Sequence, residues 1–310
     1  PSYPHFQNWL DEGNHGEMRY LERDPDRRRA PTAIVPGTRS VIVLANNYRS
    51  QEPALKTQAL RGRIARYAWN EDYHNVLSND LKTLASFLTL EGGWGRPYTD
   101  TGAILERDMA HRSGIGFVAK NTMSIRRGLG SYFFLSEILT DVELPPSDAE
   151  TSACGSCRLC IDACPSGAIK EGNKIDGRLC ISYLTIELKG PIPRPLRPLI
   201  GDWLFGCDIC QEVCPWNANP RATTRKDFLP SKPDSTSPYL PELLALDDAA
   251  FRARFAGSPL LRPKRRGLLR NACVVLGNGK DPQAAPSLLH ALEDAEPLVR
   301  GHAAWALGEI

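Results

Sequence analysis

Eight of the nine cysteines in this 310-residue chain are concentrated in its middle, between Cys154 and Cys214. The first four, beginning at Cys154, follow the spacing Cys-x2-Cys-x2-Cys-x3-Cys-Pro. Bacterial ferredoxins bind two iron–sulfur clusters with this spacing, because three closely spaced thiolates hold one cluster and the fourth holds the other. A second run, beginning at Cys207, ends in the same way but has one cysteine fewer, and Cys180 in the preceding segment is the candidate for the missing ligand.

The spacing divides the eight thiols into two sets, each suited to one 4Fe–4S cluster. The expected ligands of the first cluster are Cys154, Cys157, Cys160 and Cys214, and those of the second are Cys164, Cys180, Cys207 and Cys210. Structural zinc is the alternative, because zinc sites also use paired cysteines. Zinc requires neither this spacing nor two runs that exchange their last ligand, so clusters are favoured. The ninth cysteine, Cys273, lies in an apolar stretch and is expected to be buried.

The rest of the composition is typical of a globular protein without membrane spans. Hydrophobic residues make up 42% of the chain and charged residues 24%, and no apolar run approaches the roughly 18 residues of a transmembrane helix. The first 16 residues lack the basic and apolar regions of a signal peptide. The expected location is the cytoplasm, where clustered cysteines bind metals more often than they form disulfides.

An α+β fold is predicted, beginning with a domain at residues 1–150 that alternates strand-like and helical segments. A strand is expected at 40–45 and another at 131–135, because both stretches are short and rich in β-branched or aromatic residues. Helices are expected at 72–90, where apolar residues recur on one face, and at 102–111.

Two smaller domains are predicted to follow. Residues 151–235 are the expected ferredoxin-like domain, in which the clusters substitute for a large hydrophobic core. Residues 236–310 are the expected HEAT-like helical module, since Leu276-Gly277 recurs as Leu307-Gly308 at an offset of 31. Because the chain stops at Ile310, this module is expected to be truncated.

Three short motifs in the first domain resemble known sites, and each has a simpler explanation. The segment from Gly114 to Ala119 matches a dinucleotide-binding fingerprint, but it follows a helix rather than a strand, so Gly114 is expected to end that helix. The triplet at Asp100 occurs once, whereas aspartic proteases need two opposed carboxylates, so Asp100 alone indicates a turn residue or a helix N-cap. The segment around His74 lacks the glycine of corrinoid proteins that supply an axial histidine, and His74 is expected to be structural or exposed.

Seven positive charges and no acidic residue lie in the 19 residues from Arg252 to Arg270. An unbalanced, arginine-rich stretch is typical of phosphate binding in nucleic-acid-binding proteins. The alternative is a solvated helix face. The residues predicted to contact RNA are Lys264, Arg265, Arg266 and Arg270.

Taken together, these segments resemble the epoxyqueuosine reductase family, cobalamin-dependent enzymes of the last step of queuosine synthesis on tRNA. The likeness spans nearly the whole chain, and its most specific part is the stretch Cys180-Ile-Ser-Tyr-Leu-Thr. Compared with the family, this sequence is expected to lack the first strand and the last helical repeats. The matching stretches are Asp72–His74, Asp100–Gly102, Gly114–Asn121, Gly130–Tyr132, Cys180–Thr185, Gly206–Gln211 and Cys214–Asn217.

The resemblance implies that cobalamin lies between the first two domains, close to one cluster and without an axial histidine. Electrons would pass from the outer cluster to the inner one and on to cobalt, and the epoxide oxygen would leave as water. This reaction consumes protons and needs a general acid. The resemblance assigns that role to Asp100, whose pKa would be raised by burial against the corrin. The corrinoid-contacting positions that it implies are Arg28, Asp100, Ser124, Leu135, Ser182 and Asp208.

The implied partners are the anticodon stem-loop of a tRNA and an external electron donor such as a flavodoxin or ferredoxin, with the protein acting as a monomer away from membranes. Two alternatives stay open. A reductive dehalogenase uses the same cofactors, but it commonly has a twin-arginine leader and a tyrosine acid, and it has no use for a basic helical module. A ferredoxin-type electron carrier would bind the clusters without cobalamin.

Overall fold

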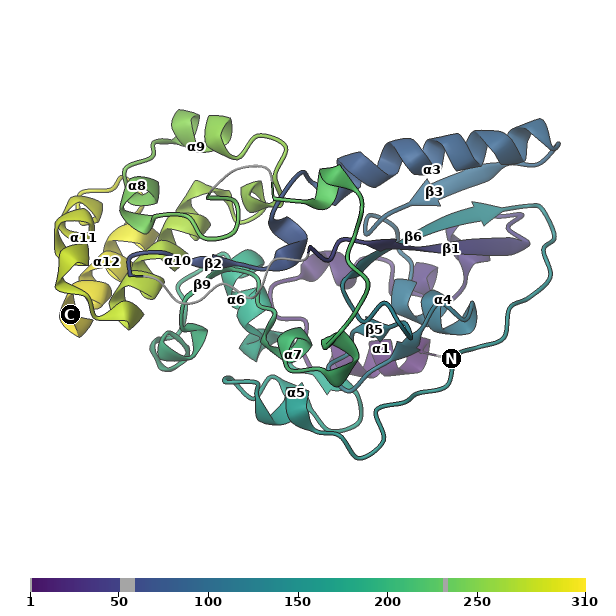
Figure 1. The fold of residues 1–310 in the computed structure, drawn as a ribbon, viewed down its shortest axis with the longest axis horizontal. Helices are drawn as coiled ribbons and strands as arrows, with labels where there is room; N and C mark the ends of the chain where they lie inside the picture. The colour runs from purple at the N-terminus through teal and green to yellow at the C-terminus, as the bar shows by residue number, and fades with distance from the viewer. Residues whose placement is uncertain (1, 51–58, 231–233) are drawn as a thin grey trace.

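The computed structural model of the chain describes residues 2–50, 59–230 and 234–310. Residues 1, 51–58 and 231–233, which belong to the first two predicted domains, lie outside the described residues. A small sheet with its helices lies at one end of the long axis, helices α8 to α12 lie at the other, and the cysteine-rich segment lies between them (Figure 1). Within the described ranges, no helix is both long and apolar enough to cross a membrane.

A three-stranded antiparallel sheet forms the centre of the first domain. Its strands, in spatial order, are β1 (Ser40–Asn47), β6 (Phe133–Thr140) and β3 (Gly95–Tyr98). The strand expected at 40–45 is confirmed. The strand expected at 131–135 instead begins at Phe133 and continues to Thr140, because every residue of β6 pairs with β1.

Helices cover both faces of this sheet. On one face, α3 (Tyr73–Leu90) packs Leu77 and Leu81 against β6. Successive residues of a strand point to opposite faces, and on the other face Leu139 packs against Met109 of α4 (Glu106–Arg112). The helix predicted at 72–90 is confirmed. The helix predicted at 102–111 begins only at Glu106, because the residues before it form a loop in which Asp100 has a φ of 53°.

Short elements connect the sheet to the cysteine-rich segment. The hairpin of β4 (Phe117–Val118) and β5 (Ser124–Ile125) follows α4, and a Cβ added at Gly116 would lie 2.4 Å from the Ile125 carbonyl oxygen. Gly114 has a φ of 69° directly after α4, as expected of a glycine that ends a helix. The remaining short elements of this half are α1 (Tyr3–Asp11), α2 (Pro31–Ile34), α5 (Leu159–Asp162), β7 (Ile169–Lys170), β8 (Lys174–Ile175), α6 (Ile181–Ile186) and α7 (Ile209–Glu212).

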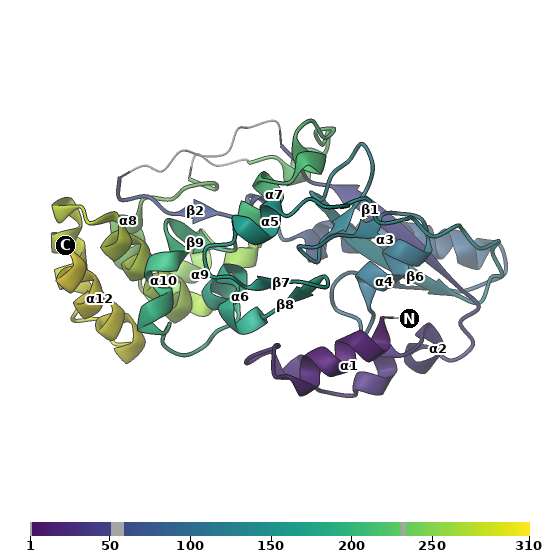
Figure 2. The same ribbon diagram turned by 90° about the horizontal axis from the view of Figure 1, so that it is seen from below.

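The C-terminal end of the molecule is helical and includes two short strands from the earlier segments. Strand β2 (Arg63–Ile64) pairs in parallel with β9 (Trp203–Phe205), and both strands contribute residues to the helical core. Figure 2 shows α10 and α12 side by side at this end, and a Cβ added at Gly277 of α10 would lie 2.9 Å from the Ala306 Cα atom of α12. The helices are α8 (Leu240–Leu244), α9 (Asp248–Arg254), α10 (Lys264–Gly279), α11 (Ala285–Ala291) and α12 (Pro297–Glu309). Cys273 is fully buried in α10, which confirms its prediction.

Candidate active site and iron–sulfur centre

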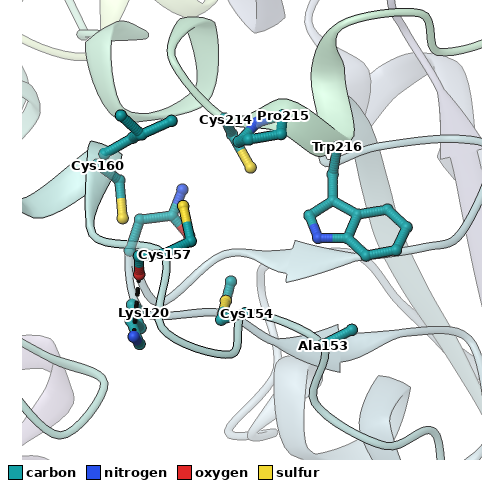
Figure 3. Close-up of a pocket in the computed structure, with 11 residues that line it drawn as sticks. Lys120, Ala153, Cys154, Cys157, Cys160, Cys214, Pro215 and Trp216 are labelled. Atoms are coloured by element: carbon teal, nitrogen blue, oxygen red, sulfur yellow. Dashed lines mark hydrogen bonds between the residues drawn. The ribbon is translucent and has the colours of Figure 1, made fainter.

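The first predicted set of cysteines surrounds one cavity of about 260 Å³, next to the β4–β5 hairpin. Figure 3 shows the sulfur atoms of Cys154, Cys157, Cys160 and Cys214 directed into this shared space. The Lys120 ammonium group donates hydrogen bonds to the carbonyl oxygens of Gly155 (2.8 Å) and Cys157 (2.9 Å) and so fixes the loop between the first two cysteines.

The second predicted set is also brought together, on the more buried side. Burial raises the pKa of the Cys207 and Cys210 thiols, and the neighbouring Cys180 raises both further. Cys164 in turn raises the pKa of Cys180 and of Cys210. Cys180 and Cys207 also pack against the same apolar cluster, and buried thiols need a cationic partner to lose their protons.

The first four thiols line one cavity, an arrangement that fits a cluster. Zinc would need four ligands within about 2.3 Å of one point. In the part of the chain that the structure describes, no three His, Cys, Asp or Glu side chains are close enough to share one ion. All nine cysteines are free rather than disulfide-bonded. Four thiols around a cavity therefore fit a cubane, whose corners hold its ligands apart.

Asp100 lies in the loop between β3 and α4, with its carboxylate directed toward the start of α3. The Tyr73 hydroxyl donates to Oδ2 of Asp100 at 2.7 Å, and Nε2 of His74 lies 3.7 Å from the same oxygen. The Asp100 side chain is 62% exposed, so it is open to a ligand. The N-cap of α4 is Leu105, which excludes the interpretation of Asp100 as the cap of that helix.

The raised pKa expected for Asp100 concerned the protein with cobalamin bound, and in the chain alone the shift has the opposite direction. Desolvation by the surrounding protein raises the pKa of Asp100, but the nearby His74 and the hydrogen bond from Tyr73 outweigh it, so the pKa lies below its ordinary value. The same contacts, with a hydrogen bond to Asp72, raise the pKa of His74 to about 9. Near neutral pH, the proton of this group therefore resides on His74 rather than on Asp100.

Arg262 from the helical module extends to the same region. Its guanidinium group lies 3.1 Å from Glu187 and 5.7 Å from the centre of the Tyr20 ring. Its charge contributes to the lowered pKa of Asp100. Tyr20 is 44% exposed, so an accessible aromatic ring and a cation lie together here.

The positions implied for corrinoid contact differ in how much of their hydrogen-bonding capacity is used. Oγ of Ser124 and Nη1 of Arg28 are buried atoms without a hydrogen-bond partner among the described residues. Leu135 and Ser182 are partly buried. Asp208 is buried, and its carboxylate accepts hydrogen bonds from the Arg66 amide (2.7 Å) and from Nε2 of Gln211 (3.1 Å), so its described contacts are structural.

Two of the four residues predicted to contact RNA already use their side-chain donors in hydrogen bonds or ion pairs within the protein. Arg270 is fully buried and donates to the carbonyl oxygens of Leu184, Leu188 and Gly190, so its prediction is wrong. Arg265 forms an ion pair with the buried Asp294 and donates to the Leu246 carbonyl oxygen, so its donors are also used. Lys264 is exposed and Arg266 partly exposed, and both stay candidates.

Sequence reasoning missed several residues that the fold brings to Asp100. His74 was expected to be structural or exposed, yet it contacts the candidate acid. Glu106 accepts the Asp100 backbone N–H at 2.7 Å, and Glu137 is a fully buried carboxyl group on the central strand. A glutamate within the otherwise apolar residues of β6 was the available signal for the latter. No comparable signal marked Arg262, because it belongs to a run with six other cations.

Three family models match separate parts of the chain. Residues 28–101 match the model described as epoxyqueuosine reductase QueG, DUF1730. Residues 153–217 match the 4Fe-4S double cluster binding domain, and residues 260–310 match HEAT repeats. The double-cluster and helical-repeat predictions are thereby confirmed.

Curated relatives match over almost the whole chain. The epoxyqueuosine reductase of Escherichia coli (strain K12) is 40% identical over 314 residues, covering 99% of this chain and 82% of the relative. That of Pseudomonas aeruginosa is 41% identical over 317 residues, covering 98% and 86%.

Solved structures agree with this likeness. A crystal structure of epoxyqueuosine reductase with an epoxyqueuosine-modified tRNA-Tyr stem loop matches with a TM-score of 0.92 and 33% identity, covering 99% of this chain and 83% of that one. A Bacillus subtilis epoxyqueuosine reductase, with its catalytic aspartate loop swung out of the active site, matches with a TM-score of 0.89 and 33% identity, covering 99% and 83%.

Proposed function

The chain belongs to the epoxyqueuosine reductase family, and from this premise we propose how its own residues reduce epoxyqueuosine to queuosine in the anticodon loop of tRNA. The reaction replaces the two C–O bonds of an epoxide by a C=C bond and releases water, so it takes up two electrons and two protons. One observation supports this assignment above the others. A carboxylate with its own proton donors, Asp100 with Tyr73 and His74, lies in the same molecule as two sets of four thiols.

Cobalamin is the proposed site of reduction, and the described residues fit it. Its corrin ring carries amide side chains, and Oγ of Ser124 and Nη1 of Arg28 are buried without a partner in the described ranges, so both have hydrogen-bonding capacity for such groups. Leu135 and Ser182 would complete the contact, as the family resemblance implies. When bound, cobalamin supplies reduced cobalt for the epoxide, and the two clusters supply the electrons.

The chain's own residues supply the protons. With its lowered pKa, Asp100 is ionised near neutral pH and orients the donors rather than storing the proton. His74, with a pKa of about 9, is protonated under the same conditions and lies against Oδ2 of Asp100. We therefore assign Asp100 as the group that passes a proton to the substrate oxygen, with His74 as the source that recharges it.

The loop that carries Asp100 is proposed to move. In the Bacillus subtilis relative, the catalytic aspartate loop has been seen swung out of the active site. Asp100 has a left-handed φ of 53°, a conformation that aspartate adopts more readily than most non-glycine residues. Closing of this loop would bring the acid to the substrate after the RNA has bound.

The substrate-binding surface is proposed to include Lys264, Arg266 and Arg262. Exposed cations hold phosphates, and the exposed ring of Tyr20 beside Arg262 offers a surface for stacking an unpaired base. The proposed partners are the tRNA anticodon stem-loop and an external flavodoxin or ferredoxin as electron donor. We propose that the protein acts as a monomer in the cytoplasm.

The test is conversion of a synthetic stem-loop that carries epoxyqueuosine. The protein is reconstituted anaerobically with iron, sulfide and cobalamin, a chemical reductant is added, and the nucleosides are analysed by mass spectrometry. Formation of queuosine supports the proposal. Stoichiometric cobalamin without conversion of the stem-loop would favour a dehalogenase-type activity, and failure to bind cobalamin would favour an electron carrier.

A further inference from the structure

The turn of the β4–β5 hairpin, residues 120–122, has no role in the mechanism above, although it lies against the cysteine-rich segment. Lys120 and Asn121 line the cavity that the first set of cysteines surrounds. Figure 3 shows Lys120 beside Cys157 at the edge of this cavity. The turn therefore brings side chains of the first domain to the proposed cluster site.

The ammonium group of Lys120 is held by two backbone carbonyl groups of the cysteine run. Its Nζ atom donates to the Gly155 carbonyl oxygen at 2.8 Å and to the Cys157 carbonyl oxygen at 2.9 Å. Both oxygens belong to the short loop that begins at Cys154, so the positive charge is fixed next to the ligands of the first cluster.

No acidic side chain neutralises this charge within the described ranges, where the contacts of Nζ are the two carbonyl oxygens. Two other cations of this region differ from Lys120. Arg127 pairs with Glu150 at 2.7 Å, and Arg158 pairs with Glu171. Lys120 therefore contributes a net positive charge at the site, whereas each of these arginines is balanced by a carboxylate.

The turn that carries Lys120 is fixed on both sides. Asn121 is 3% exposed, and its Nδ2 atom donates to the carbonyl oxygen of Cys210, in the second ligand set, at 3.2 Å. Arg107 of α4 donates to the carbonyl and hydroxyl oxygens of Thr122 at 2.5 Å and 3.2 Å. These contacts hold Thr122 at a φ of 64°, which a β-branched residue rarely adopts. The fold therefore determines where the turn presents Lys120.

A cluster held by four thiolates responds to a fixed charge of this kind. The thiolates make the site negative, and one-electron reduction adds a further negative charge. A cation nearby stabilises the reduced form more than the oxidised form, so it raises the reduction potential. Leu159, which lines the same cavity, is 50% exposed, so the first cluster site lies close to the surface, where an external donor can deliver electrons.

We infer that Lys120 raises the reduction potential of the first cluster and thereby makes it the acceptor of electrons from the external donor. In this step the donor loses one electron and the cluster gains it, no bond forms or breaks, and Lys120 keeps its proton. The inference rests on the proposed ligand set of the first cluster and is independent of the role of Asp100.

Redox titrations of the reconstituted protein with dithionite and mediators, followed by electron paramagnetic resonance of the reduced clusters, test the inference without turnover. Lys120→Gln keeps an N–H donor but removes the charge. It should make reduction of the first cluster about tenfold less favourable, a fall of about 59 mV for one electron. The potential of the second cluster should change less, because the described contacts of Lys120 are with the loop of the first.

Matched variants separate the charge from the hydrogen bonds. Lys120→Arg keeps both the charge and the donors and should retain the wild-type potential. Lys120→Met lacks both and should resemble Lys120→Gln. The exposed Lys82 of α3 supplies the control Lys82→Gln, which should leave both potentials unchanged. Iron content should stay at about eight per chain in every variant.

The outcomes separate this inference from the proposed function. An unchanged potential in Lys120→Gln with full iron content would overturn the inference even if queuosine is formed. Loss of about four irons in both neutral variants but not in Lys120→Arg would also overturn it, because Lys120 would then hold the cluster in place rather than set its potential. If wild type fails to convert epoxyqueuosine but the potential falls as described, the inference stands and only the proposed function fails.

Discussion

Nε2 of His74 lies 3.7 Å from Oδ2 of Asp100, while Nδ1 of the same ring lies 2.7 Å from the carboxylate of Asp72. The imidazole thus lies between two acidic side chains at the start of α3. Both contacts favour the protonated ring, which explains why its pKa is raised to about 9 despite partial burial. At neutral pH His74 is charged and Asp100 is ionised, so the two residues share the role of a general acid. His74 holds the proton, and Asp100 passes it on.

Replacement of Asp100 should abolish turnover and leave the cofactors in place. Asp100→Asn removes the carboxylate that passes the proton, and a general acid contributes about 100-fold to 10,000-fold to rate. Iron content and the cobalamin absorption spectrum should match those of wild type. Asp80→Asn, at a residue that pairs with Arg225 on the surface, is the matched control. Near-normal queuosine formation by Asp100→Asn would remove Asp100 from the mechanism.

The rate should fall as the pH rises through about 9, the value to which the pKa of His74 is raised. Below this pH the ring is protonated and can recharge Asp100, and above it the proton is lost. His74→Gln should be slower at neutral pH and should lack this decline. Initial rates from pH 6 to 10, measured with saturating stem-loop, test this prediction. A wild-type profile that is flat across pH 9 would contradict it.

The same group makes stability depend on pH. A histidine whose pKa is raised on folding stabilises the folded state fully below its unfolded value of about 6.5. That contribution is lost as the pH rises through about 9, because the folded protein then no longer binds the extra proton. Wild type should therefore lose more thermal stability than His74→Gln between pH 6 and pH 10. Equal losses of thermal stability in both proteins would show that protonation of His74 does not contribute to the stability of the fold.

Replacement of single cysteines should remove one cluster at a time. Two 4Fe–4S clusters correspond to about eight irons per chain, and loss of one ligand set should leave about four. Cys180→Ala should remove the second cluster, and Cys154→Ala the first. Cys273→Ala is the control, since Cys273 is fully buried in α10 away from both sets and should leave iron content unchanged. A wild-type iron content of about four, or stoichiometric zinc, would contradict the assignment.

The cysteine assignments could be predicted because the spacing of cluster ligands is encoded locally. Three of the four ligands of the first set lie within seven residues, from Cys154 to Cys160, so the chain can fold only a short loop around them. Helix α3 could be predicted for the same reason, because its apolar periodicity is a local property.

The environment of Asp100 could not be predicted, because it is assembled from distant segments. Tyr73 and His74 come from α3, Glu137 from β6, and Arg262 from the helical module. Tyr73, His74 and Arg262 together lower the pKa of Asp100 in the chain alone. The burial of Arg270 could not be predicted from the sequence either, because its hydrogen-bond partners are carbonyl oxygens about 80 residues earlier in the chain.

The last prediction concerns which cations of the basic stretch bind RNA. Arg265→Ala is a poor probe, because it leaves the buried Asp294 unpaired and should destabilise the fold by about 3–5 kcal/mol. Lys264→Ala and Arg266→Ala remove cations for which no ion pair is found in the described ranges. If these side chains hold phosphates, affinity for the stem-loop should fall and stability should not.

Salt dependence distinguishes a phosphate contact from a solvated face. Each lost contact should reduce the slope of log K against log salt by about 0.9 for duplex or 0.7 for single-stranded nucleic acid. Titrations of the stem-loop at several salt concentrations should therefore give the double variant Lys264→Ala, Arg266→Ala a slope smaller by about 1.4 to 1.8. Lys82→Ala on α3, at the opposite end of the molecule from α10 (Figure 1), should leave both affinity and slope unchanged.

Because the variants lie in a different part of the fold from Asp100, conversion of stem-loop already bound should proceed at the wild-type rate. An unchanged slope in the double variant would mean that these two cations are only solvated, and the RNA surface would then have to be sought around Arg262 and Tyr20.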